Sequence, residues 1–104
     1  MMYNEEQFCK RLTQLRELKG VSAREMSLSI GQGPAYINNI ENGRRLPSLM
    51  GFFYICDYFG ISPEEFFNEA DSNPTESKQW LSLFQGLSPD QRANILSLME
   101  GLKK

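Results

Sequence analysis

Histidine is absent from this chain of 104 residues. The commonest general base of enzymes is therefore missing, and the sequence has neither a glycine-rich phosphate loop nor a nucleophile elbow. Acidic pairs do occur, at Glu5-Glu6 and at Glu64-Glu65. Because adjacent helical residues point in different directions, we interpret both pairs as solvated helix N-termini favoured by the dipole. The sequence thus predicts a protein that is not an enzyme.

Cysteine is scarce as well. The two cysteines, Cys9 and Cys56, lie within apolar helical patterns, and neither has a partner at the spacing of a metal site. We predict that both are reduced residues of the core. The sequence therefore predicts no metal site and no cofactor.

Long apolar runs are also missing. The longest, residues 49–59, is interrupted by Gly51 and Asp57 and is too short to span a bilayer. The first residues, Met1-Met2-Tyr3, begin neither a basic region nor the apolar stretch of a secretion signal. We therefore expect a cytoplasmic protein without membrane contact.

An excess of positive charge is missing too, since the formal net charge is −2 and the isoelectric point is about 5.1. This charge differs from the usual footprint of a nucleic-acid-binding protein. Its distribution is uneven: residues 1–50 hold seven Lys and Arg against five Glu, and residues 51–104 hold four basic against eight acidic residues. The first half is mildly basic and the second half is acidic.

Helical periodicity runs through the whole chain, and no segment alternates with a period of two, so we predict an all-α fold. The expected helices cover residues 5–19, 23–30, 34–42, 49–59, 63–68, 75–85 and 89–103, with a linker at residues 71–74. The residues expected to face inward on the helices of residues 5–19, 49–59 and 63–68 are Phe8, Leu12, Leu15, Leu18, Leu49, Phe52, Phe53, Cys56, Phe59, Phe66 and Phe67.

Residues 22–43 are the most informative stretch, because they predict two short helices joined by a tight turn. Ser22 and Glu25 form an S-x-x-E capping box, which predicts two reciprocal hydrogen bonds at the first helix start. Gly31 can take the positive φ of the turn. Gly33 as N-cap and Pro34 in the first turn predict the start of the second helix.

The motif Met26-Ser27-x-x-x-Gly31, followed by Tyr36-Ile37-x-x-Ile40-Glu41-Asn42-Gly43 and Pro47-Ser48, resembles the phage-repressor and Cro-type helix-turn-helix family. The resemblance implies a five-helix, lambda-repressor-like domain over residues 1–70, followed by a two-helix extension over residues 71–104. It also implies a transcriptional regulator, by family habit a repressor, that binds double-stranded DNA as a dimer. The second helix of the motif would lie in the major groove.

The resemblance also implies roles for particular residues. The family often has a phosphate-binding glutamine where Ala23 stands, and Arg24 beside it is the expected substitute. Base-reading positions fall on the turn and the second helix: Gln32, Pro34, Ala35, Tyr36, Asn38 and Asn39. We expect Asn39 to read adenine, with Asn38 and Tyr36 assisting; the alternative is that both asparagines are ordinary solvated surface.

Phosphate contacts are expected from Arg24, Asn42, Arg44 and Arg45. The resemblance further implies an ion pair between Arg16 and Glu41, which would join the first helix to the end of the recognition helix. The alternative is two exposed charges that contribute little to stability.

The C-terminal tail is amphipathic, and we expect it to form a homodimer interface. The residues expected there are Trp80, Phe84, Ile95, Leu98, Met99 and Leu102. The alternative is that the tail folds back on its own domain. A second hypothesis for the whole chain is a protein-interaction module of antitoxin or co-regulator type. Its helix-turn-helix would no longer read DNA, and its acidic tail would bind a protein partner.

Overall fold

The computed structural model describes residues 3–103, and this part of the chain is all helical, which confirms the predicted all-α fold. The helices are α1 (Glu5–Lys19), α2 (Ala23–Ser29), α3 (Tyr36–Glu41), α4 (Leu49–Phe59), α5 (Pro63–Phe67), α6 (Pro74–Gln85) and α7 (Pro89–Leu102). Met1 and Met2, on which the expectation about a secretion signal partly rests, lie outside the described residues. None of the described helices is long and apolar enough to cross a membrane.

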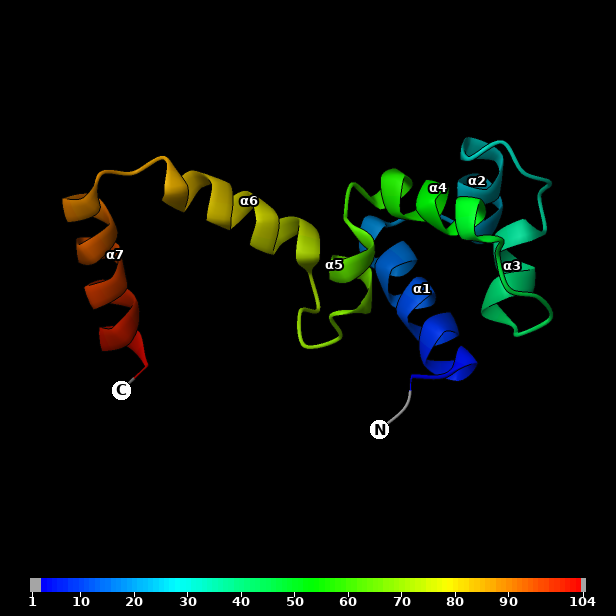
Figure 1. Ribbon diagram of the computed structural model, residues 1–104, viewed down its shortest axis with the longest axis horizontal. Helices are drawn as coiled ribbons and strands as arrows, with labels where there is room; N and C mark the ends of the chain where they lie inside the picture. The colour runs from blue at the N-terminus through cyan, green and yellow to red at the C-terminus, as the bar shows by residue number, and fades with distance from the viewer. Residues whose placement is uncertain (1–2, 104) are drawn as a thin grey trace.

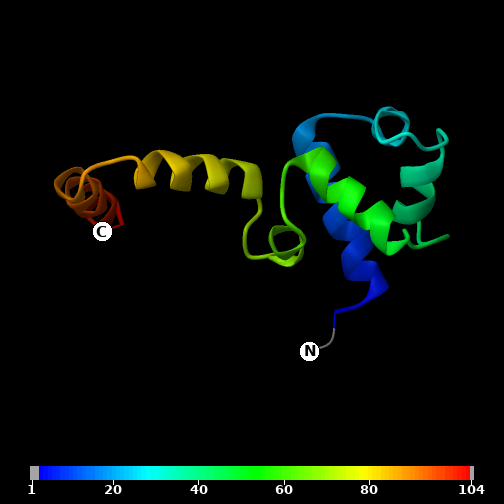
Figure 2. The same ribbon diagram turned by 45° about the horizontal axis from the view of Figure 1, so that its top comes forward.

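Helices α1 to α5 form a single group, and α6 and α7 extend away from it (Figure 1). A second view shows α4 crossing α1, with the tail again directed away from both (Figure 2). Helix α7 has no buried residue. Helix α7 therefore does not fold back on α1 to α5 in this structure, whereas the first half of α6 contacts α5, where Lys78 lies 3.5 Å from Glu65.

Local capping explains most of the helix boundaries. Ser22, Ser48, Ser62 and Ser88 each accept a hydrogen bond from a backbone N–H in the first turn of the helix that follows. At Ser22 this bond comes from the N–H of Glu25 at 3.0 Å. The reciprocal capping box predicted there forms instead at three other helices, where the caps are Asn4, Ser62 and Ser88.

The predicted start of α3 is wrong by two residues. The helix begins at Tyr36, and the cap residue Ala35 makes no capping hydrogen bond through its side chain. Gly33 and Pro34 instead belong to a turn, in which the N–H of Tyr36 donates to the carbonyl of Gly33 at 3.1 Å. Pro34 therefore serves the turn rather than the first helical turn.

The core lies between α1, α2, α3, α4 and α5, with Met26 as the contribution of α2. Phe8, Phe52 and Phe66 form its aromatic centre, where the ring of Phe66 lies 5.1 Å from each of the other two. Both free cysteines are buried. Burial raises the pKa of the Cys56 thiol to about 11, so this group is neutral at physiological pH.

The predicted inner face of α4 is rotated by about one position. Gly51 and Ile55 are buried, whereas Leu49 and Phe53 are 70% and 38% exposed. The reason is the close approach of α3: a Cβ on Gly51 would lie 2.6 Å from the hydroxyl of Tyr36. Two further residues expected inside, Phe67 and Leu18, are 43% and 50% exposed.

Candidate nucleic-acid interface

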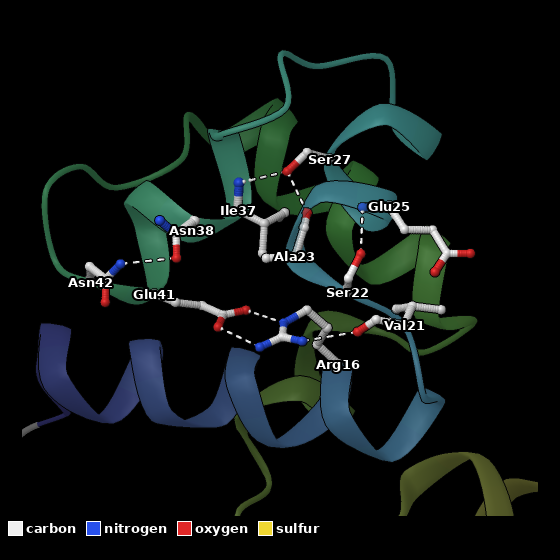
Figure 3. A network of polar contacts seen from close by, with 10 residues as sticks. All are labelled: Arg16, Val21, Ser22, Ala23, Glu25, Ser27, Ile37, Asn38, Glu41 and Asn42. Carbon is white, nitrogen blue, oxygen red and sulfur yellow. Dashed lines mark hydrogen bonds and ion pairs between the residues drawn. The ribbon is translucent and has the colours of Figure 1, made fainter.

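The side chain of Ser27 joins the two helices of the motif. Its hydroxyl is fully buried, donates to the carbonyl of Ala23 at 2.7 Å and accepts from the N–H of Ile37 at 2.9 Å (Figure 3). Helix starts leave several N–H groups without partners inside the helix. Because Ala35 has no side chain that can cap α3, Ser27 on α2 supplies the missing acceptor. The sequence suggested only a small residue here, and missed this role.

We expect Ser27→Ala to lower the free energy of unfolding by about 1–3 kcal/mol, because it leaves the buried N–H of Ile37 without an acceptor. Ser29→Ala, in the same helix at an exposed position, is the matched control and should stay within about 0.5 kcal/mol of the parent. Urea unfolding measures both. Equal stabilities of the two variants would contradict the capping role.

The outward face of α3 is formed by residues three and four apart. Ala35, Asn38 and Asn42 are exposed, whereas Ile37 and Ile40 are fully buried. The amide nitrogen of Asn42 donates to the side-chain oxygen of Asn38 at 3.0 Å. The two amides therefore support one another on the surface of the helix.

The expectation that Tyr36 lies on this exposed face is wrong. Tyr36 is 7% exposed and packs in the core against α4. Its ring instead supports the guanidinium of Arg45, which lies 5.0 Å from the ring centroid. Tyr36 therefore positions a loop arginine and is not itself available to a base.

Asn39 lies at the edge of the outward face and is half-buried. Its side-chain oxygen accepts a hydrogen bond from Arg44 at 3.3 Å, and its carbonyl accepts from the backbone N–H of Arg44 at 2.9 Å. Both loop arginines are thus held against α3, Arg44 through Asn39 and Arg45 through Tyr36. Because these contacts already restrict the two arginine side chains, less conformational entropy would be lost if the arginines bound a phosphate.

A shallow depression lies beside α3, lined by Ala23, Arg24, Pro34, Ala35 and Asn38. The structure therefore brings together Arg24 with three of the predicted base-reading residues. Gln32, in the turn, is half-buried and is not part of this lining. The depression lies between the exposed guanidinium of Arg24 on α2 and the exposed amide of Asn38 on α3. A surface that contacts both the phosphates and the base edges of DNA needs groups of both kinds.

Arg16 and Glu41 form a bidentate ion pair between α1 and the end of α3. The two nitrogen–oxygen distances are 2.7 and 3.0 Å, and Arg16 also donates to the carbonyl of Val21 at 2.9 Å. The side chains of Arg16 and Glu41 are only 17% and 10% exposed. The hydrogen bond to Glu41 raises the pKa of Arg16 above its usual value. This pair joins α3 to α1.

The positive charge of the first half is less available than its count suggests. Arg11 is 1% exposed and Arg16 is engaged with Glu41, so neither can reach a phosphate. The exposed arginines of this half are Arg24, Arg44 and Arg45, and the latter two follow α3 directly. The exposed arginines are therefore few and border one helix face, whereas the other exposed cations of this half, Lys10 and Lys19, lie on α1. Within residues 3–103 no cluster of side chains is suited to a metal ion.

Comparison with known proteins agrees with this geometry. The family described as helix-turn-helix domain matches residues 9–72, a segment that begins inside α1 and ends before α6. A protein of Sinorhizobium fredii described as an uncharacterised HTH-type transcriptional regulator is 28% identical over 60 residues, which cover 58% of this chain and 78% of the relative. No solved structure matches the chain significantly.

Proposed function

This chain belongs to the helix-turn-helix domain family, and from that premise we propose that it is a DNA-binding transcriptional regulator. It binds a pseudo-palindromic operator as a homodimer and represses the neighbouring promoter. One observation carries the proposal: exposed Arg24, Arg44 and Arg45 border the outward face of α3. The printed description of the Sinorhizobium fredii relative supports the same function.

Asn38 is the principal base-reading residue in this proposal, in place of Asn39. It is exposed, lies in the depression with Arg24 and is supported by Asn42. An asparagine amide pairs with adenine through N6 and N7, and Pro34 and Ala35 can pack on thymine methyl groups. The expected half-site is therefore rich in A·T pairs.

We expect Asn38→Ala to relax the base preference at one or two positions of the half-site by about 1–3 kcal/mol. Asn39→Ala is the matched comparison, because Asn39 is the neighbouring asparagine but is half-buried and bonded to Arg44. Competition binding with single-base variants of the selected site measures both. A preference that Asn39→Ala relaxes and Asn38→Ala preserves would return the role to Asn39.

The loop after α3 supplies phosphate contacts in this proposal, through Arg44, Arg45 and Asn42, with Arg24 on the opposite side of the depression. Replacing both loop arginines, Arg44→Gln with Arg45→Gln, should weaken binding to all duplexes alike. It should also reduce the slope of log affinity against log salt by about 2, one for each lost contact. Lys19→Gln removes a distant cation, which lies over Tyr58, and should leave the slope unchanged. A loss confined to one sequence would argue against backbone contacts.

Residues 1–70 act as the DNA-binding domain in this proposal, and residues 71–104 as the linker and dimerisation tail. Trp80 and Phe84 stack one turn apart on α6, with ring centroids 5.0 Å apart. Leu98, Met99 and Leu102 are 62%, 44% and 77% exposed, and Ile95 is half-buried beside them. Exposed apolar surface of this extent is typical of a protein interface.

A second candidate function is a protein-interaction module of antitoxin or co-regulator type. The observation that favours it is the turn that leads into α3, where Gly33, Pro34 and Ala35 offer no side chain that can hydrogen-bond a base. The net charge of −2 points the same way. In this alternative the acidic tail binds a protein partner.

Selection of the purified protein against a random duplex library, at two salt concentrations, separates the two functions. A two-fold site whose half-sites lie about one helical turn apart, and whose affinity falls steeply with salt, is expected for a dimeric DNA reader. The absence of enrichment at both salt concentrations would overturn DNA reading and favour the protein partner.

A further inference from the structure

The outer face of α4 is an apolar surface that nothing in the structure covers. We call it the α4 face and define it by Leu46, Leu49, Met50, Phe53 and Tyr54, which are 50%, 70%, 55%, 38% and 49% exposed. On the helix, Leu49 and Phe53 lie one turn apart, as do Met50 and Tyr54, so the four form one stripe. No charged residue occurs in residues 46–56. Depletion of charge is typical of the centre of protein interfaces.

The tail carries a second apolar surface of similar extent. We call it the tail face and define it by Trp80, Leu81, Leu98, Met99 and Leu102. All five are exposed, and the last three lie on one stripe of α7. The part of this face on α6 is also without charge, because residues 79–89 contain no acidic or basic side chain, whereas Glu100 and Lys103 adjoin Met99 and Leu102 on α7. The chain therefore has two unpartnered apolar surfaces, one on the domain and one on the tail.

The junction before α6 directs the tail away from its own domain. The carboxylate of Asp71 accepts from the N–H of Asn73 at 3.1 Å and from the hydroxyl of Ser77 at 2.9 Å. Pro74, the first residue of α6, is fully buried. These contacts fix the direction in which α6 leaves α5, and both views show α6 pointing away from α4 (Figures 1 and 2). The tail face is therefore presented to another molecule.

We propose that the tail face of one copy packs on the α4 face of a second copy, and that the contact is reciprocal. The inference rests on the proposed homodimer and names its receiving surface. Pairing of tails alone would leave the α4 face in water, whereas reciprocal docking covers both surfaces. Helix α7, with 14 residues, is long enough to lie along all 11 residues of α4.

The area of these surfaces suits a stable dimer. A large aromatic side chain buries about 150–250 Å² when covered, so each face offers on the order of 500 Å² at the exposures given above. A two-fold dimer contains two copies of each face, each covered once, so it would bury on the order of 2,000 Å² in total, which is in the range of stable dimers. The recognition face of α3 stays free, because neither surface includes Asn38 or Asn42.

Charge substitution followed by mixing tests the contact. One variant carries Met50→Lys and Tyr54→Lys on the α4 face, and the other carries Leu98→Glu and Leu102→Glu on the tail face. Leu28→Lys is the matched control, since Leu28 is 51% exposed on α2 and belongs to neither face. Sedimentation gives the dimer affinity, native mass spectrometry identifies mixed dimers, and helix content by circular dichroism reports folding. Glutamine at the same four positions gives a second, milder pair of variants.

We expect each double variant alone to dimerise about 100-fold more weakly or worse, because an unpaired charge would be buried in each contact. Mixing the two should restore a heterodimer, in which one contact is unaltered and the introduced lysines face the introduced glutamates. The control should dimerise like the parent.

Three results would overturn the proposal. Normal dimerisation of the α4-face variant, with loss in the tail variant and no rescue on mixing, would mean that tails pair with tails. Normal dimerisation of the tail variant would mean that the α4 faces pair with each other. A monomeric parent chain would remove the dimer altogether. Duplex selection reports base reading by α3 separately, so failure of this contact and failure of DNA recognition are distinguishable.

Discussion

Arg11→Met is expected to lower the free energy of unfolding by about 3–5 kcal/mol, because it removes a buried cation that holds the end of α5. The guanidinium of Arg11 donates to the carbonyls of Phe66, Glu65 and Asn68 at 2.5, 2.9 and 3.1 Å. The carbonyls of Glu65 and Asn68 also accept from the backbone N–H groups of Asn68 and Asp71, whereas the buried carbonyl of Phe66 relies on Arg11. The dipole at this helix C-terminus favours a cation. A buried carbonyl left without a donor costs about 1–3 kcal/mol, and each lost hydrogen bond to a charged group costs about 1.5–3 kcal/mol.

Urea unfolding measures this loss, with Lys10→Met as the control. Lys10 is the neighbouring cation on α1, and its side chain is 77% exposed, so its replacement should change stability by less than about 1 kcal/mol. Arg11→Lys should recover only part of the loss, because one ammonium cannot reproduce the planar fork of donors. If Arg11→Met unfolded at the same urea concentration as Lys10→Met, the role of Arg11 in holding α5 would be refuted.

The helix boundaries were largely predictable, because capping is a local interaction. The serines before α2, α4, α5 and α7 bond N–H groups three residues on, and the predicted bounds of residues 5–19 and 49–59 agree with α1 and α4. The start of α3 is the exception. The N–H of Ile37 is bonded by Ser27 from another helix, and no local pattern contains that contact.

The direction in which side chains point was less predictable, because it depends on how the helices pack. Arg11 contributes to the positive charge of residues 1–50, yet it is buried against α5. Tyr36 was placed on the reading face, yet it fits against Gly51 of α4. In each case the deciding neighbour lies at least 15 residues away in sequence. Sequence periodicity gives one apolar stripe for each helix, but it does not say which polar residues another helix will cover.

The candidate site was predicted as a set of residues but not as an arrangement. The family resemblance predicts a site formed by Arg24 and by residues within 32–45. The structure brings Arg24, Pro34, Ala35 and Asn38 to one depression. The different exposure of Asn38 and Asn39 could not be inferred, because it depends on the path of the loop after α3. This loop returns Arg44 against Asn39 and leaves Asn38 exposed.

The second large effect is expected at the ion pair that joins α1 to α3. Glu41→Gln should lower the free energy of unfolding by about 3 kcal/mol, because it leaves the charge of Arg16 largely buried without a counter-charge. Breaking a buried pair by removing one partner costs about 3–5 kcal/mol, and the glutamine amide retains one acceptor oxygen, which places this variant at the low end. Glu6→Gln breaks the exposed pair with Lys10, 3.1 Å long, and should cost about 1 kcal/mol or less.

Replacement of both partners tests whether the Arg16–Glu41 ion pair stabilises the fold or only positions α3. Arg16→Met combined with Glu41→Leu leaves no stranded charge, so the double variant should be more stable than Glu41→Gln alone. Its α3 would nevertheless be held less firmly, because the bidentate contact and the bond from Arg16 to the carbonyl of Val21 are gone. We therefore expect the double variant to regain thermal stability while binding the selected duplex more weakly than the parent. A Glu41→Gln protein that melts like the parent would instead mean that the two charges contribute little in solution, and that α3 is held mainly by its buried residues Tyr36, Ile37 and Ile40 and by the Ser27 hydrogen bond.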